Sequence, residues 1–302
     1  MNGSAPRSID DYLTALRASL AGEDPALIQD ALYDAEAHLR AEAAANPGKP
    51  EAEVLERVVD TYGRPEEIAA AYRDAEVKVA HAFQVPRATS PRGPLKRFFS
   101  VYSDPHAYLS LFFMFMSLVT GIVYFTFAVT GLSLSFGLAI LIFGLPLFLA
   151  FIGIARVIAL GEGRLLEAVS GERMPRRPVH PGPRGSLWER IGAMLRDART
   201  WSTLVYLMLM LPLGIIYFTL ATTALSLGVS LTFVPIIGIG NRLDWWAEWG
   251  IDRLDMHPMW FDTPAGWVFC VVMGPVVLTA LLHFARAVIG LHARTAKALL
   301  VT

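Results

Sequence analysis

The sequence predicts an all-α, polytopic membrane protein with four transmembrane helices, arranged as two repeated hairpins, and a small N-terminal cytoplasmic helical domain. Apolar residues make up 54% of the 302 residues and charged residues only 18%, whereas soluble domains carry roughly 25% charge. Residues 107–155, 200–241 and 263–285 contain no Asp, Glu, Lys or Arg, and about 20 apolar residues are enough to cross a bilayer. These long uncharged runs predict membrane-spanning helices.

Residues 1–83 are expected to form four short amphipathic helices. Helix starts are indicated at Ser8, at Asp24-Pro25, near Pro50 and at Pro65, by capping residues or by proline in the first turn. Gly63 suits the end of the third helix, because glycine tolerates positive φ. About 80 residues make a marginal core, so we expect this module to dock against the membrane part or against a second copy.

This module resembles the bacterial HAAS signalling domain over roughly residues 8–75. The residues that carry the resemblance are Tyr12-Leu13, Asp30, Asp34-Ala35-Glu36-Ala37-His38-Leu39 and Tyr62-Gly63-Arg64-Pro65-Glu66-Glu67-Ile68-Ala69. Members of this family are helical modules fused to membrane segments and are often encoded beside PadR-like repressors. The resemblance therefore implies a cytoplasmic protein partner, such as a transcriptional regulator.

A proline-rich linker, residues 84–94, separates the module from a four-span region, residues 95–302. The first uncharged stretch should hold two helices with a turn near residues 131–137. The third helix is expected at about 202–226, followed by a further apolar segment to Gly240, and the fourth at about 265–290.

The spans repeat within the chain. Residues 120–138 and 213–231 are identical at eleven of 19 positions, at an offset of 93. The return helices match at an offset of 130, which aligns Arg156 with Arg286. We therefore predict hairpin repeats at about 95–170 and 186–302, related by an axis along the membrane normal and entering from the same side. An outer amphipathic insertion occupies about 238–264 of the second unit.

Arginine placement predicts the topology. The loop between the units, residues 157–200, carries eight arginines, whereas the opposite side carries only Arg242 and Arg253. The positive-inside rule then places both termini and the central loop in the cytoplasm. Together with the HAAS resemblance, this implies a multi-pass protein of the bacterial inner membrane.

The region 95–302 resembles a sensor domain found as the membrane input of some bacterial histidine kinases. The matching residues are Trp201, Tyr206-Leu207, Leu211-Pro212-Leu213-Gly214-Ile215, Phe261-Asp262-Thr263-Pro264, Ala285-Arg286, Leu291-His292-Ala293-Arg294 and Ala298-Leu299. No phosphoacceptor domain or nucleotide loop accompanies it, so kinase activity is not implied.

Two groups of residues inside the spans are candidate contact sites. Tyr124 and Tyr217 fall at equivalent repeat positions, and a hydroxyl in hydrocarbon needs a partner. They indicate either a site on the repeat axis or aromatic anchors near the outer interface. Arg156, Arg190 and Arg286 lie near the cytoplasmic side, where they are expected to snorkel or to contact anionic lipids.

The outer insertion is the third candidate. Asn241–Met256 has the pattern of an amphipathic helix with one acidic face. It would serve as an aromatic cap on the bundle or as a platform for a ligand, cation or partner. The candidate residues are Asp244, Trp245, Trp246, Glu248, Trp249 and Asp255.

The predicted function is non-enzymatic membrane sensing, in which a membrane or extracytoplasmic cue reaches the cytoplasmic module. No nucleophile–base pair, metal constellation or nucleotide fingerprint is present, so we expect no catalytic residue, metal or other cofactor. The net charge of −1 gives no case for direct nucleic-acid binding. The alternative is an accessory or assembly subunit of a larger membrane complex, and homo-oligomers fit either reading. A transporter ranks third, because we expect no acidic or basic residue in mid-membrane that could couple ion movement.

Overall fold

The computed structural model describes residues 6–83, 93–138, 144–177, 192, 194–245, 247 and 263–301. Within these ranges the regular structure is helical, with no strand. The all-α prediction is therefore confirmed.

The N-terminal module consists of α1 (Ile9–Ser19), α2 (Pro25–Ala45), α3 (Glu51–Tyr62) and α4 (Pro65–Phe83). Ser8 caps α1 by accepting from the Asp11 backbone N–H, and Asp24 caps α2 by accepting from the Ala26 N–H. Gly63 ends α3 with φ of +114°, a conformation that suits glycine. The predicted starts and this end are confirmed.

The module buries its own apolar core. Its largest buried side chains are Tyr12, Leu16, Leu20, Leu39 and Leu55. The hydroxyl of Tyr12 also donates to the carbonyl oxygen of Gly63 at 2.9 Å, so the end of α3 is tied to α1.

A short helix, α5 (Pro94–Phe99), and a 3-10 turn, η1 (Ser100–Ser103), lead into the apolar region. Four helices follow that are long and apolar enough to cross a membrane. They are α6 (Pro105–Gly137), α7 (Gly144–Ser170), α9 (Ala198–Arg242) and α10 (Pro264–Leu300).

Three of the long helices extend beyond their predicted ends. α6 continues through the expected turn to Gly137, and α7 continues to Ser170, well into the expected loop. The segment expected after residue 226 belongs to α9, which runs unbroken past Pro212 and Pro235 to Arg242. In an apolar environment a helix satisfies its backbone groups internally, so an apolar sequence favours continuation over a break.

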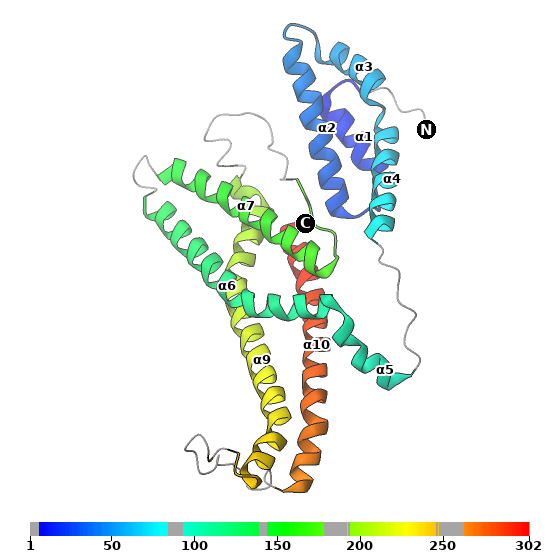
Figure 1. Ribbon diagram of the computed structural model, residues 1–302. Coiled ribbons are helices and arrows are strands. Elements are labelled where there is room, and N and C mark those ends of the chain that lie inside the picture. The colour runs from blue at the N-terminus through cyan, green and yellow to red at the C-terminus, as the bar shows by residue number, and fades with distance from the viewer. Residues whose placement is uncertain are drawn as a thin grey trace.

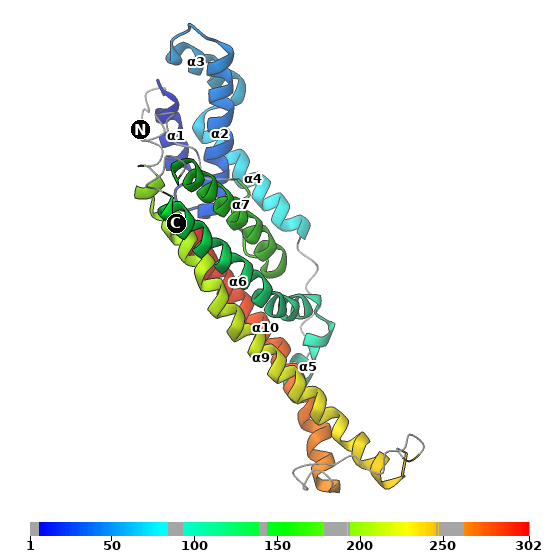
Figure 2. The same ribbon diagram turned by 90° about the vertical axis from the view of Figure 1, so that its left-hand side faces the viewer.

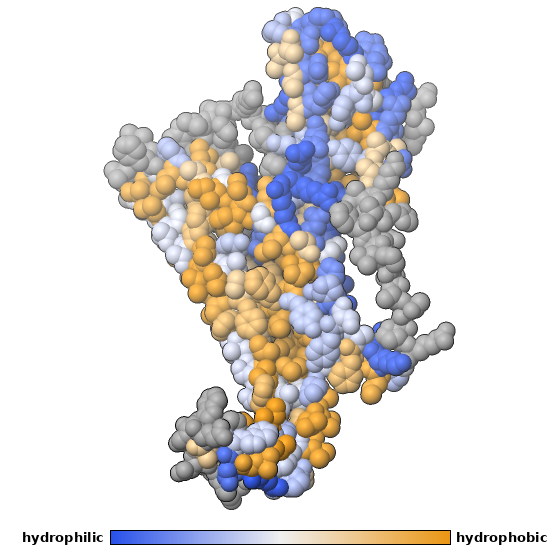
Figure 3. All heavy atoms as spheres, viewed as in Figure 1, coloured by the Kyte–Doolittle hydropathy of each residue, from blue (hydrophilic) through white to orange (hydrophobic). Residues whose placement is uncertain are grey.

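α9 and α10 form a long antiparallel pair, and α6 and α7 pack against one half of it (Figure 1; Figure 2). The N-terminal module lies at the end where α9 begins and α10 finishes. Figure 3 shows the bundle covered largely by apolar residues, whereas the module surface is mostly hydrophilic.

α6 and α9 cross closely at two glycines. A Cβ on Gly121 would lie 2.5 Å from the carbonyl oxygen of Met210, and one on Gly214 would lie 2.3 Å from that of Ser117. Residue numbers rise along one helix as they fall along the other, so the two helices are antiparallel. We expected parallel first helices, related by an axis along the membrane normal. The sequence repeat identifies equivalent residues, but it does not determine in which direction the two helices cross. The repeated hairpins themselves stay a prediction.

Candidate functional site: the contact between module and bundle

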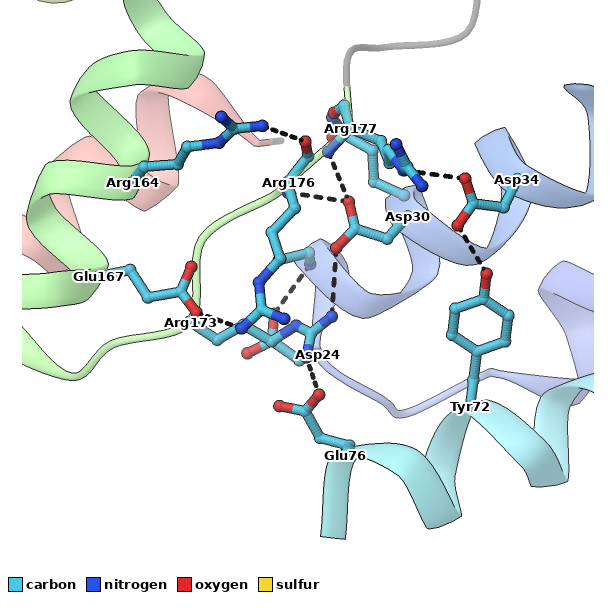
Figure 4. A network of polar contacts seen from close by, with 12 residues as sticks. Asp24, Asp30, Asp34, Tyr72, Glu76, Arg164, Glu167, Arg173, Arg176 and Arg177 are labelled. Carbon is cyan, nitrogen blue, oxygen red and sulfur yellow. Dashed lines mark hydrogen bonds and ion pairs between the residues drawn. The ribbon is translucent and has the colours of Figure 1, made fainter. Parts of the chain in front are cut away.

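A basic segment joins the module to the bundle. This segment, residues 171–177, leaves the end of α7 at Gly171, whose φ of +72° allows the turn. It runs beside α2 and α4 of the module (Figure 4). Its three arginines are Arg173, Arg176 and Arg177.

Asp30 on α2 is the centre of this contact. One of its carboxylate oxygens accepts the backbone N–H groups of Arg176 and Arg177, each at 2.9 Å. The other oxygen accepts a hydrogen bond from the Arg173 guanidinium at 3.2 Å. Asp30 is only 5% exposed, so its charge depends on these donors for compensation.

Two further pairs connect the basic segment with both helices of the module. The Arg177 guanidinium lies 2.9 Å from a carboxylate oxygen of Asp34, and Arg173 also pairs with Glu76. The second oxygen of Asp34 accepts the Tyr72 hydroxyl at 2.9 Å. Burial, together with the Asp34 carboxylate, raises the pKa of Tyr72, so its hydroxyl stays a donor. The segment thus holds α2 and α4 together.

The same contact includes the ends of α9 and α10. Lys297 on α10 lies 2.6 Å from Asp24 and 3.1 Å from Glu172. Gln29 accepts from the Arg199 guanidinium at 3.1 Å and donates to the Arg177 carbonyl at 2.8 Å. Acids on the module therefore meet cations on the bundle, an arrangement that favours specific and reversible docking.

Inside the bundle, a second group of polar residues forms what we call the buried polar chain. Its members in bonding order are Tyr124 (α6), Glu162 (α7), Tyr206 (α9), His292 (α10) and Tyr217 (α9). The Glu162 carboxylate accepts from Tyr124 at 2.9 Å and from Tyr206 at 3.2 Å. His292 lies 3.1 Å from the Tyr206 oxygen and 3.3 Å from the Tyr217 oxygen.

The predicted residues Tyr124 and Tyr217 therefore both have protein partners, and the chain connects them. A ligand role for either tyrosine stays a prediction. Glu162 and His292 were not expected to carry such a role, although they are 2% and 1% exposed inside the bundle. The expectation that no acidic or basic residue lies in mid-membrane stays a prediction, although these two side chains are buried between the long helices. One signal in the sequence could have identified this pair: the repeat offset of 130 residues aligns Glu162 with His292.

Two of the three predicted lipid-contacting arginines form ion pairs. Arg156 lies 3.1 Å from Asp197, and Arg286 lies 2.9 Å from Asp104. Arg190 lies outside the described residues. Lipid contact by these arginines stays a prediction.

The outer insertion is described only at its start. Asn241 and Arg242 end α9, and the Arg242 guanidinium stacks 4.4 Å above the Trp267 ring. Asp244 and Trp245 follow in an exposed turn in which Asp244 has φ of +50°. Trp246, Glu248, Trp249 and Asp255 lie outside the described residues, so the proposed acidic platform stays a prediction.

The basic segment was the main element that the sequence did not reveal. Its arginines were counted only as evidence for topology. Asp30 was noted only as part of the HAAS resemblance, and nothing in the local pattern connects it with residues about 145 positions later. Among the described residues, no group of three or more His, Cys, Asp or Glu side chains could hold a metal ion.

Comparison with known proteins identifies two families in the chain. A family model described as HAAS matches residues 11–71, and one described as Putative sensor matches residues 113–300. Neither is a catalytic family, and their order is the one predicted. No curated protein matches the chain. No solved structure matches it. Because the second model covers more than half of the residues, the chain belongs to the Putative sensor family and carries a HAAS domain ahead of its sensor domain.

Proposed function

We propose that the protein is a membrane sensor whose HAAS module is held by the basic segment and is released or repositioned when the bundle changes its packing. The observation that carries this proposal is the position of Asp30. It bonds the main chain of the segment that directly follows α7, so a movement of α7 reaches the module without an intervening linker.

The composition of the contact supports reversibility. It is polar, and a cavity of about 320 Å³ lies against it, lined by Asp30, Asp34, Tyr72 and the segment arginines among others. Polar contacts of this kind exchange with water more readily than a packed apolar interface does. The released acidic face of α2 would then be available to a cytoplasmic protein partner.

The contact also bears on topology. The module, the basic segment and the end of α10 lie together, which favours their lying on one side of the membrane. With the arginine bias, this supports an inner-membrane protein whose termini are both cytoplasmic.

The coupling can be tested by disulfide crosslinking in the full chain in lipid nanodiscs. Cysteines replace Gln29 and Arg177 in a Cys270→Ser background. Asp30→Ala should lower the crosslinking rate several-fold, because the backbone N–H groups of Arg176 and Arg177 lose their acceptor and Arg173 loses one of its two carboxylate partners. Asp10→Ala, at an exposed position in the first turn of α1, is the matched control and should leave the rate unchanged. An unchanged rate in Asp30→Ala would show that Asp30 does not hold the module.

The signalling role needs a second measurement in the host cell. We expect Asp30→Ala to alter the same transcripts as deletion of the chain does, whereas Asp10→Ala should match the wild type. If Asp30→Ala releases the module but leaves transcription unchanged, the coupling proposal fails. If deletion also changes no transcript and the chain purifies in a stoichiometric membrane complex, the accessory-subunit function replaces it.

A further inference from the structure

The buried polar chain connects all four long helices. Each helix contributes at least one member. Tyr124 comes from α6 and Glu162 from α7, Tyr206 and Tyr217 come from α9, and His292 comes from α10. The three interior members, Glu162, Tyr206 and His292, are all nearly inaccessible to solvent. Buried polar networks of this kind are stable only when every member has its partner.

Counting donors and acceptors gives one complete pattern for the chain without an added proton. Tyr124 and Tyr206 donate to the two oxygens of an ionised Glu162. The Tyr206 oxygen then accepts the Nε2–H of a neutral His292, and the Nδ1 of His292 accepts the Tyr217 hydroxyl. Every hydroxyl hydrogen, the ring N–H and both carboxylate oxygens are used.

One added proton has only a few places to go. It can bind His292 at Nδ1. It can instead bind the Glu162 oxygen that faces Tyr206; Glu162 then donates to Tyr206, Tyr206 donates to Nε2 of His292, and the ring N–H moves to Nδ1. In both cases His292 donates to Tyr217 instead of accepting from it. Alternatively, a protonated Glu162 donates to the oxygen of Tyr124. Each arrangement balances the protons, and each turns one terminal tyrosine from a donor into an acceptor.

We propose that the buried polar chain is a proton-binding site that takes up one proton and thereby changes the hydrogen bonding of one terminal tyrosine, Tyr124 or Tyr217. The affected contact joins α6 to α7 in the first case and α9 to α10 in the second. The hydroxyl hydrogen that loses its acceptor must find another, and a buried donor without an acceptor is unfavourable. Proton binding therefore alters how two helices pack.

The charged surroundings fit this assignment. The titratable side chains that contact Glu162 are Tyr124 from α6 and Tyr206 from α9, with His292 from α10 one bond further on. Elsewhere on α7, Arg156 pairs with Asp197 and Glu167 pairs with Arg176. Among the described residues, no lysine or arginine forms an ion pair with Glu162. No permanent positive charge therefore neutralises this carboxylate in place of the added proton.

The sequence supplies a further contrast. At the offset of 93, Tyr206 aligns with Phe113, whose ring centroid lies 5.3 Å from that of His292. Only the tyrosine provides a hydroxyl between Glu162 and His292. Tyr206→Phe should therefore interrupt the chain while keeping an aromatic ring in place.

The test uses infrared difference spectroscopy of the full chain in lipid nanodiscs across a pH titration. We expect a carboxylic-acid C=O band that titrates in the wild type and is absent in Glu162→Gln. Glu167→Gln, at a partly exposed ion-paired position five residues later on α7, is the control and should keep the band. Tyr206→Phe should shift the midpoint of its titration, because the carboxyl is then separated from the imidazole.

A band that persists unchanged in Glu162→Gln, or the absence of any titrating carboxyl band or histidine ring band in the wild type, would overturn the site. If Glu162→Gln does not fold, Glu162→Asp serves instead, and an unchanged spectrum in that variant would also overturn it. Asp30→Ala should leave the band intact. The proton site and the proposed module coupling can therefore fail independently.

Discussion

Asp197 uses one carboxylate oxygen to cap α9 and the other to pair with Arg156. The first accepts the Arg199 N–H at 3.1 Å, and the second lies 3.1 Å from the Arg156 guanidinium. Asp104 repeats this arrangement at the start of α6. It accepts the His106 N–H at 3.0 Å and lies 2.9 Å from Arg286. Each aspartate thus fixes the start of one apolar helix against a different neighbouring helix.

Asp197→Ala should therefore lower the free energy of unfolding by about 1–2 kcal/mol, because both the cap and the ion pair are lost. Asp197→Asn keeps a capping oxygen and should cost less. Thermal midpoints of the full chain in detergent would show the order wild type, Asn, Ala. Equal losses in the two variants would mean that the cap contributes nothing.

The close crossing of α6 and α9 predicts that a methyl group added at a crossing glycine destabilises the bundle. Gly121→Ala places Cβ against the Met210 carbonyl and should destabilise the bundle by about 1–3 kcal/mol. Gly161→Ala on α7 is the control, because a Cβ there meets nothing within 4 Å. Its thermal midpoint should stay the same or rise slightly, since alanine favours helix. Similar midpoints for both variants would contradict the close crossing.

Gly63 provides a test within the HAAS module. Its φ of +114° is unfavourable for a β-branched residue. Gly63→Val should therefore destabilise the module by about 1 kcal/mol or more, while the four long helices remain folded. Hydrogen exchange in α1 and α3 should accelerate, whereas Ala70→Val, at an exposed position on α4, should have little effect. Unchanged exchange in Gly63→Val would show that the backbone there adapts to a side chain.

Glu36 predicts a pH dependence of module stability. Burial raises its pKa, against the opposing effect of Arg40 at 2.5 Å. The folded module therefore holds this proton more tightly than the unfolded chain does. The stability contribution is greatest at acid pH and is lost as the pH rises from the ordinary value of 4.5 through the raised pKa.

Glu36→Gln removes this titration. Hydrogen exchange of α2 in the variant, relative to wild type, should be slowed more at neutral pH than at acid pH. If the difference in exchange rate between the variant and the wild type is the same at every pH, Glu36 has the same pKa in the folded and the unfolded chain. Ala37→Gln, at the neighbouring exposed position on α2, introduces an amide without removing a carboxyl group and is a control that should show no such trend.

The parts of this structure that depend only on residues close together in the sequence were predictable. Ser8, Asp24 and Gly63 act within one helical turn, and long uncharged runs determine the apolar helices regardless of packing. The direction in which α6 crosses α9 depends instead on contacts between residues about 90 positions apart. The repeat pattern identified Gly121 and Gly214 as equivalent, but either direction of crossing would preserve that equivalence.

The candidate site was less predictable for the same reason. Asp30 gains its role from backbone N–H groups of Arg176 and Arg177, which carry no sequence signature. Glu162 lay outside the uncharged runs and was assigned to a loop, although α7 continues past it. Its hydrogen-bond partners, Tyr124 and Tyr206, come from two other helices, so no local window of sequence contains the pattern.

The contact between module and bundle also has a consequence for biogenesis. The module's core joins residues within 9–72, so its contacts can form while later segments are still being synthesised. Its ties to the basic segment must wait for residues 173–177, and the pairing of Asp24 with Lys297 must wait for the last long helix. Docking of the module is therefore a late assembly step that can finish only after α10 has been synthesised. A variant whose final helix fails to insert should leave an already folded but undocked module, which is a distinct target for proteolytic quality control.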